Sequence, residues 1–404
     1  MERKRGPRLT RRGFLGTAAL AASVRAGGAP PVSPERGPRV PVVDITDLYH
    51  PPQDPGDNLD LVAAYALPEV DLRAVVLDVT QRYRRPYQVP DGGLYSDPLG
   101  GRDPGFIPVW QLNWIFGRQV PCAAAPFEPM RGPEDRMEDA PPFQQAGISL
   151  LLDTLRQSPE PVEIVSFGSA RPLAVALNRE PELLREKTRR VRLCAGAAPA
   201  GYLEWNVQLD VHAFVRVLQS DLPLALYPCA TERDVFVLGP HNTYWLLPDL
   251  SLIRRVAPQL RRYIAYAFER SSRVDFLAAM EDDPSGEAVD RIAALPHNVW
   301  ETDVWMHTAG RRLVRRAGGE HRILPPASVL ATDTDLTPEI RPCRIDVRPD
   351  GHFDFALSDR PERAGIFHRP DPPAHQRALI EALPELYASF SVNTPHAGAK
   401  GEHS

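Results

Sequence analysis

The sequence places a dense set of carboxylates directly after its first apolar run. Val40–Val43 is typical of a buried strand, and six oxygen-bearing residues follow it: Asp44, Asp47, Asp54, Asp57, Asn58 and Asp60. Carboxylates so close together repel one another unless a cation lies among them, and calcium prefers oxygen ligands of this kind. Asp57 and Asp60 are three residues apart, so they would share one face of a helix. Helix caps and a solvated acidic loop would explain the same residues, and the spacing favours neither interpretation.

A second polar stretch runs from Glu204 to Asp210. Glu204 and Asn206 flank Trp205, and an acid and an amide beside an aromatic ring could bind the hydroxyl groups of a sugar. Asp210 precedes an apolar helical pattern and is predicted to be its N-cap. On its own, the stretch is explained as well by a polar loop with one anchoring tryptophan.

A third stretch runs from His297 to Trp305. A histidine can protonate a leaving group near neutral pH, which makes His297 a candidate general acid. Taken alone, however, the stretch is better explained as the start of an amphipathic helix that buries Trp300 and Trp305.

The elements around these stretches alternate between strand and helix. Strands are expected at Val40–Val43, Leu72–Val79, Val162–Phe167, Val191–Cys194 and Leu222–Tyr227, with helices between them such as Leu59–Leu67, Ala146–Leu155 and His212–Leu218. This order predicts an α/β fold with a mostly parallel central sheet, helices on both faces and a helical C-terminal part. In such sheets ligands bind beyond the carboxyl ends of the strands, where the aspartates and Glu204 fall. The C-terminal part is expected to contain a helix from Leu252 to Ala267 and a hairpin turn at Asp350-Gly351.

Composition sets broad limits on function. The 404 residues are 43% hydrophobic and carry a net charge of -5, without a lysine/arginine block beyond the N-terminus, so no nucleic-acid partner is expected. Beyond the N-terminal segment no apolar run approaches the ~18 residues of a membrane span. The four cysteines match no zinc spacing and are expected to be small core residues.

The N-terminus has the order of an export signal. Thr10-Arg11-Arg12-Gly13-Phe14-Leu15 matches a twin-arginine motif, and the apolar run Phe14–Val24 is followed by small residues. We expect a signal peptide at 1–26, a linker at 27–39, a domain at 40–390 and a disordered tail at 391–404. The expected destination is periplasmic or extracellular. A disordered basic tail is the alternative.

Together the three stretches resemble the inosine/uridine-preferring nucleoside hydrolase family, over roughly residues 40–390. The best match is Glu204 to Asp210, where the family has Glu-Phe-Asn, three residues and then Asp at a helix start. Further matches are Pro161–Gly168, Cys194–Ala197, Pro68–Leu72, Asn113 and Val120-Pro121. The order of these motifs is that of the family.

The resemblance implies hydrolysis of the N-glycosidic bond of a ribonucleoside, with a calcium ion that binds water and the ribose diol. Carried over by position, the catalytic residues are Asp47 and His297, and the metal ligands are Asp47, Asp57, the carbonyl of Arg171 and Asn298. The substrate-binding residues are Asn58, Asn113, Glu204 and Asn206. The implied partner is a small-molecule nucleoside or related glycoside, and a homo-oligomer is compatible with the resemblance.

Several positions depart from the family pattern. Ile45 replaces the first aspartate of the opening loop, and a rival register matches Asp54-Pro55-Gly56 to the family's Asp-Pro-Gly. Asn298 stands where the family has an aspartate, and Asp54, Asp60, Glu301 or Asp303 could take its place as a ligand. These losses leave a second hypothesis open, a catalytically degenerate nucleoside or sugar binder. A third is a scaffold or interaction protein.

Overall fold

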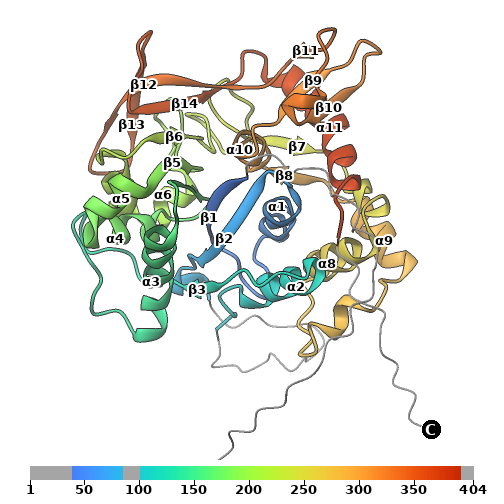
Figure 1. The fold of residues 1–404 in the computed structure, drawn as a ribbon, viewed down its shortest axis with the longest axis horizontal. Coiled ribbons are helices and arrows are strands. Elements are labelled where there is room, and N and C mark those ends of the chain that lie inside the picture. The colour runs from blue at the N-terminus through green and yellow to red at the C-terminus, as the bar shows by residue number, and fades with distance from the viewer. Residues whose placement is uncertain (1–38, 85–100, 393–404) are drawn as a thin grey trace, which may run out of the picture. The chain divides into compact units, whose positions relative to one another are not determined.

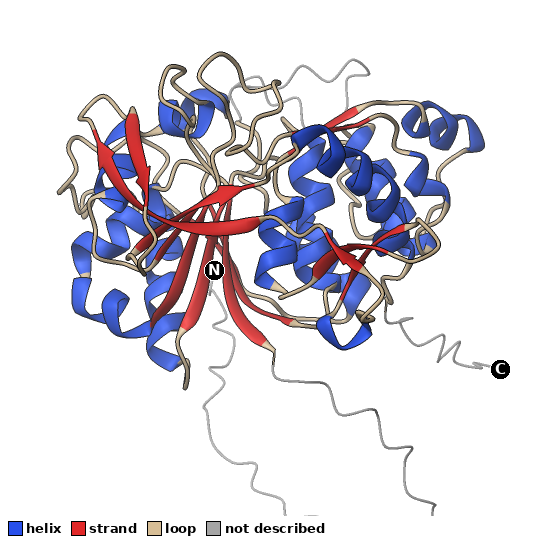
Figure 2. Cartoon of the chain, turned by 90° about the horizontal axis from the view of Figure 1, so that it is seen from above, coloured by secondary structure: helices blue, strands red, loops and turns tan. Residues whose placement is uncertain are grey.

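A nine-stranded, mostly parallel sheet forms the centre of the computed structural model, which describes residues 39–84 and 101–392. Its strand order is β13-β12-β14-β6-β5-β4-β1-β2-β3 (Figure 1), and Figure 2 shows helices on either side of the strands. All neighbouring strands pair in parallel except β12, which pairs antiparallel with β13 and β14. The predicted α/β fold is confirmed. The strands are β1 (Val40–Thr46), β2 (Val70–Leu77), β3 (Cys122–Ala124), β4 (Val162–Ser166), β5 (Thr188–Leu193), β6 (Leu224–Leu226), β12 (Glu339–Val347), β13 (Phe353–Leu357) and β14 (Ala364–His368).

Helices cover both faces of the sheet. Side chains alternate between the faces along β1, so that Val42 packs in one core and Val43 and Ile45 in the other. The Val42 core contains side chains of α1 (Pro55–Ala66), α2 (Phe106–Phe116), α8 (Pro258–Phe268), α9 (Gly286–Ala293), α10 (Thr302–Thr308) and α11 (Pro372–Ala388). The opposite core contains side chains of α3 (Pro142–Gln157), α4 (Arg171–Arg179), α5 (Pro181–Lys187), α6 (Trp205–Leu209) and α7 (Val211–Leu218).

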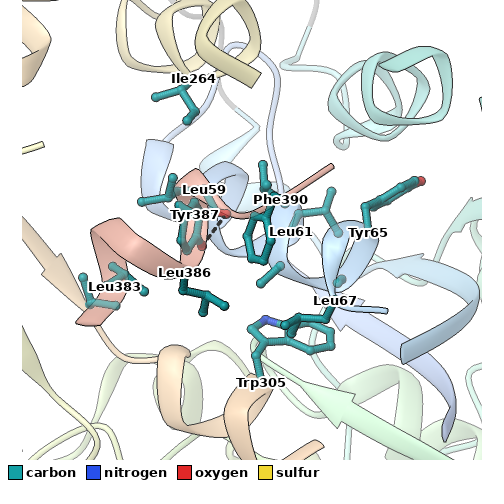
Figure 3. Close-up of a cluster of buried hydrophobic side chains, with 14 of the residues drawn as sticks. Leu59, Leu61, Tyr65, Leu67, Ile264, Trp305, Leu383, Leu386, Tyr387 and Phe390 are labelled. Atoms are coloured by element: carbon teal, nitrogen blue, oxygen red, sulfur yellow. Dashed lines mark hydrogen bonds between the residues drawn. The ribbon is translucent and has the colours of Figure 1, made fainter. Parts of the chain in front are cut away.

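The C-terminal helix closes the face that carries α1. Tyr387 of α11 lies among leucines of α1 and Trp305 of α10, and its hydroxyl donates to the carbonyl of Leu59 at 3.0 Å (Figure 3). Residues more than 300 positions apart in the sequence are thereby joined, and α1 and α10 are held in one packed layer.

The C-terminal part contains more strand than the sequence predicted. Strands β7 (Trp245–Leu247) and β8 (His297–Val299) form a small sheet, and β9 (Arg312–Arg315), β10 (His321–Leu324) and β11 (Thr334–Asp335) form another. The expected helix start at His297 is therefore wrong: β8 occupies it, and α10 begins only at Thr302. These strands are short and solvent-facing in part, so period-two alternation had too few residues to show itself.

Two helix boundaries follow from proline and a cap. The expected helix from Leu252 to Ala267 is divided into a 3₁₀ turn, Ser251–Arg254, and α8, because Pro258 has no backbone N–H and starts a new helix. Helix α1 begins at Pro55 because Asp54 caps it, accepting from Gly56 N at 2.8 Å.

The Asp350-Gly351 hairpin between β12 and β13 is confirmed, with Gly351 at φ +87°.

The expected signal peptide at 1–26, nearly all of the linker and most of the C-terminal tail lie outside the described residues. In the part of the chain that the structure describes, no helix is both long and apolar enough to cross a membrane.

One ion-pair network ties the sheet to the helices of the second face. Arg171 at the start of α4 is fully buried, and its guanidinium lies 3.4 Å from Asp78 Oδ1 and 3.6 Å from Asp210 Oδ2. It also donates to Thr80 Oγ1 and the carbonyl of Phe127. The segments that follow β2 and β3, and the junction between α6 and α7, are thus held to α4 by one cation.

Replacing Arg171 by methionine is expected to lower the free energy of unfolding by about 3–5 kcal/mol, because Asp78 and Asp210 would remain buried without their cation. Denaturant unfolding measures this. The matched control is Arg254→Met, which removes a solvent-exposed pair with Asp290 and should leave the unfolding midpoint unchanged. Equal midpoints for the two variants would show that the buried network does not stabilise the fold.

Candidate active site

Four carboxylates from three segments line one small cavity at the carboxyl end of β1. Asp44 points to the face of the sheet that carries α1, because it shares the period-two alternation of Val42. Asp57 and Asp60 reach the cavity from the first turns of α1, and Glu301 reaches it from the loop before α10. We call this space the carboxylate cavity and the four acidic residues its members. Its lining is completed by Thr46, Leu61, Phe167 and Trp305.

Burial and repulsion raise the pKa of every member of the carboxylate cavity. Burial, then the charge of Glu301, raises the pKa of Asp44 to about 8. Burial and Glu301 also raise the pKa of Asp60, whose carboxyl group is hydrogen-bonded to that of Glu301. Asp44 Oδ1 is buried, with no hydrogen-bond partner in the described part of the chain. The cavity therefore holds acceptor oxygens in excess of donors.

Glu301 is placed by the loop geometry that precedes α10. Its Oε2 accepts from the backbone N–H of Trp300 at 3.1 Å. The helix that follows is anchored at both ends. His307 Nε2 lies 3.0 Å from the carbonyl of Pro338, and Asp303 lies 3.2 Å from His375. A rigid α10 fixes the position from which Glu301 reaches the other carboxylates.

Asp47 and Asp54, the aspartates of the two rival registers, both lie beside the carboxylate cavity. Asp47 is half-buried just after β1, and burial followed by Asp78 and Asp54 raises its pKa. Burial, followed by the charges of Asp47 and Asp54, raises the pKa of Asp57. The fold thus gathers the aspartates of both registers around the N-terminus of α1.

His297 lies against the first turn of α1. A side chain at Gly56 would meet His297 Nε2 at 2.5 Å, so only glycine leaves room for the imidazole there. Burial lowers the pKa of His297, and the charge of Asp54 partly opposes that shift. His297 thus stands beside the aspartates, as the sequence predicted.

Asn298 and Asp303 do not join the carboxylates, which corrects two expectations. Adjacent residues of a strand face opposite sides, so Asn298 points away from the side that His297 occupies. Its Oδ1 accepts from Tyr244 Oη at 3.0 Å. Asp303 is fully buried against His375 and does not line the cavity. Of the two acidic residues in this segment that could replace the lost aspartate, Glu301 and not Asp303 lines the cavity.

Glu204 and Asn206 hold the loops at the ends of the neighbouring strands. The buried Glu204 carboxylate accepts from the N–H groups of Gly196 at 2.8 Å and Asn206 at 2.9 Å, and burial raises its pKa to about 7. Asn206 Nδ2 donates to the carbonyls of Phe167 and Cys194. Both residues lie at the carboxyl edge of the sheet, and sugar binding by them stays a prediction.

Two other predicted residues have partners within the chain. Asn58 donates to Tyr263 Oη at 3.3 Å. Asn113 accepts from Tyr65 Oη and exchanges two hydrogen bonds with the backbone of Val120. Tyr65 is eight residues from Asp57 along α1, roughly 12 Å, so Asn113 lies at the far end of that helix.

Arg171 is the first residue of α4, and its side chain neutralises Asp78 and Asp210. These contacts involve the guanidinium and not the backbone carbonyl, so the ligand role of the Arg171 carbonyl stays a prediction.

The donor set of the carboxylate cavity suits a hard cation. Its oxygens are of the type that calcium prefers, and a cation would remove both the repulsion that raises the pKa values and the unpartnered state of Asp44 Oδ1. Within residues 39–84 and 101–392, no three histidine, cysteine, aspartate or glutamate side chains already converge as a coordination site.

Comparisons with known proteins agree with the resemblance seen in the sequence. The chain is similar to the pyrimidine-specific ribonucleoside hydrolase of Citrobacter koseri, with 29% identity over 196 residues, which cover 43% of this chain and 57% of the relative. The corresponding hydrolase of Salmonella arizonae is 26% identical over 195 residues. The chain thus spans little more than half the length of these relatives. No family model matches the chain.

Solved nucleoside hydrolases were found among similar structures. The inosine-uridine preferring enzyme of Bacillus anthracis shares 13% identity, covering 87% of this chain and 99% of that chain, with a TM-score of 0.43. A plant nucleoside hydrolase shares 15% identity over 85% and 98% of the two chains, with a TM-score of 0.48.

In a chelating buffer, the free energy of unfolding is expected to fall as pH rises from 5 to 8. The native state retains protons on Asp44 and Glu204, with pKa values of about 8 and 7, that the unfolded chain releases near pH ~4. The stabilisation of the native state by these two protons is complete at pH values below the pKa of the groups in the unfolded chain. It is lost as pH rises through their pKa values in the folded chain, at up to ~1.4 kcal/mol per pH unit for each proton.

Urea unfolding at several pH values measures this slope. Asp44→Asn should flatten it, whereas Asp359→Asn, at an exposed position, should leave it as in the unmodified chain. A slope that is the same in all three proteins would mean that Asp44 does not carry a retained proton.

Proposed function

We propose that this chain is a member of the nucleoside hydrolase family and hydrolyses the N-glycosidic bond of ribonucleosides. The carboxylate cavity carries the proposal, since it brings Asp44 with its unpartnered oxygen to the carboxyl edge of a parallel sheet, where ligands bind in such folds. The 29% identity to a ribonucleoside hydrolase supports it.

The cation implied by the family would be held by Asp57, Asp60 and Glu301, with Asp44 behind them. When bound, a divalent cation lowers the pKa of a water molecule and orients it. The chain supplies the groups around it. Asp47, next to Asp57 and not part of the cavity lining, is positioned to take a proton from attacking water. The surrounding carboxylates favour the positive charge that develops on the sugar ring as the glycosidic bond breaks.

The remaining predicted residues would bind the substrate and assist the leaving base. Glu204 and Asn206 stand at the ends of β4 and β5, where hydroxyl groups of a ribose could reach them. His297 is the candidate proton donor to the base. Because burial lowers its pKa, its charged form is populated only at acidic pH, and donation by His297 should weaken as pH rises.

A nucleoside binder without hydrolytic activity is the second candidate. The orientation of Asn298 toward Tyr244 favours it, because one of the oxygen ligands implied by the family is turned to another partner. The two candidates differ in whether the bound nucleoside is cleaved.

Hydrolysis is tested by following the release of free base and ribose from uridine and inosine, with uridine first because the matched relatives are named for pyrimidines. Asp47→Asn is expected to lower kcat by about 10²–10⁴-fold through loss of the general base. Asp359→Asn is the matched control and should keep full activity. Binding of uridine without release of base would assign the chain to the second candidate.

Calorimetric titration tests the cation site independently of activity. The unmodified chain should bind about one calcium ion, and Glu301→Gln should weaken binding at least ~10-fold because it removes one ligand charge. Asp303→Asn keeps an acceptor for His375 and should bind calcium as the unmodified chain does. If Asp303→Asn weakened calcium binding and Glu301→Gln did not, Asp303 and not Glu301 would be the calcium ligand.

A further inference from the structure

Two thiols lie in contact at the carboxyl ends of neighbouring strands. Cys194 follows β5 and Cys229 follows β6, and their sulfur atoms are 3.5 Å apart. Both are free thiols with at most 4% exposure. The backbone bonds Tyr227 N to Leu193 O and Cys229 N to Gly196 O, at 2.8 and 2.9 Å, fix the two segments side by side.

The carbonyls of both cysteines hold side chains of the candidate site. Asn206 Nδ2 donates to the carbonyl of Cys194 at 2.9 Å, and Trp300 Nε1 donates to the carbonyl of Cys229 at 3.1 Å. Trp300 in turn precedes Glu301 and donates its backbone N–H to that carboxylate. A movement of either cysteine is therefore transmitted to one edge of the site.

The remaining cysteines show that this proximity is specific. Cys122 and Cys343 are also free, and in the described part of the chain neither has a sulfur contact with another cysteine. We infer that Cys194 and Cys229 form a redox site, which closes to an intramolecular disulfide when the protein meets a peroxide.

The step is balanced with the peroxide as the oxidant. One sulfur, as thiolate, attacks a peroxide oxygen; the O–O bond breaks, water leaves after taking up protons, and a sulfenic acid remains. The second sulfur then attacks the first, the S–O bond breaks and a second water leaves. Two thiols and one peroxide thus give one disulfide and two waters, and two electrons pass from sulfur to oxygen.

The geometry favours the second step over further oxidation. The sulfurs must approach from 3.5 Å to about 2.05 Å, a change that side-chain rotation and a small strand shift can provide. Buried thiols ionise reluctantly, so the first step should be slow. Once formed, the bond would be shielded by the same burial from external thiols.

The full-length chain, first reduced, is treated with hydrogen peroxide, denatured and alkylated, and its peptides are mapped by mass spectrometry. The expected result is a linked Cys194–Cys229 peptide lacking two hydrogen atoms, with alkylation at these positions lowered at least 10-fold relative to Cys343. Cys194→Ser and Cys229→Ser should each abolish the linked peptide, and Cys343→Ser should retain it.

Trp300 gives a second measurement, read as the fluorescence change that Trp300→Phe removes, because the chain has six tryptophans. Its fluorescence should change in parallel with the linked peptide and return on reduction. Two results would overturn the inference. The first is that Cys194 and Cys229 remain fully alkylated under conditions in which peroxide has oxidised Cys122. The second is that disulfide links form only through Cys122 or Cys343. The peptide map is read without a substrate, so its outcome is independent of whether the chain hydrolyses nucleosides.

Discussion

The burial of several carboxylates beside one another is the constraint on which the site depends. Asp44, Asp57, Asp60 and Glu301 lie around a single small cavity, and each loses solvation and meets the charge of its neighbours. A protein tolerates such an arrangement by retaining protons or by binding a cation. The raised pKa values of Asp44, Asp60 and Glu301 favour the first solution, and the acceptor-rich lining suits the second.

The surrounding structure is arranged so that these carboxylates cannot move apart. Asp44 is fixed by a central strand, and Asp57 and Asp60 by a helix whose first turn is set by Asp54 and Pro55. Glu301 is held by α10, which is anchored through His307 to Pro338 and through Asp303 to His375. On the other face, Arg171 balances Asp78 and Asp210, so the negative charge next to Asp47 is partly compensated within the protein. The packing that fixes the four carboxylates is therefore also what buries them and keeps their charges close together.

The site shares its position in the fold with the one implied by the resemblance, but not all of its residues. Carry-over along the sequence assigned a ligand role to Asn298, and in the structure its side chain contacts Tyr244. The carboxylates that line the cavity beside Asp57 are Asp44, Asp60 and Glu301. A glutamate is longer than an aspartate, and it can reach the cavity from a loop position that a shorter side chain could not use. The pair of thiols behind Asn206 and Trp300 adds a second chemistry at the same edge of the sheet.

The sequence by itself determined the α/β class, the main strands, the Asp210 cap and the aspartate-rich start of α1, because each depends on local periodicity or on capping within a few residues. It also located Asp57, Asp60 and His297 near one another. Only the tertiary structure decided that Asp44 faces the cavity, that Glu301 joins it and that Asn298 does not. These outcomes depend on which face of the sheet a strand residue takes and on how β8 and α10 pack about 250 residues later, and no local pattern encodes contacts over that distance. The short strands β7 to β11 escaped prediction for the same reason, since their pairing rather than their composition makes them strands.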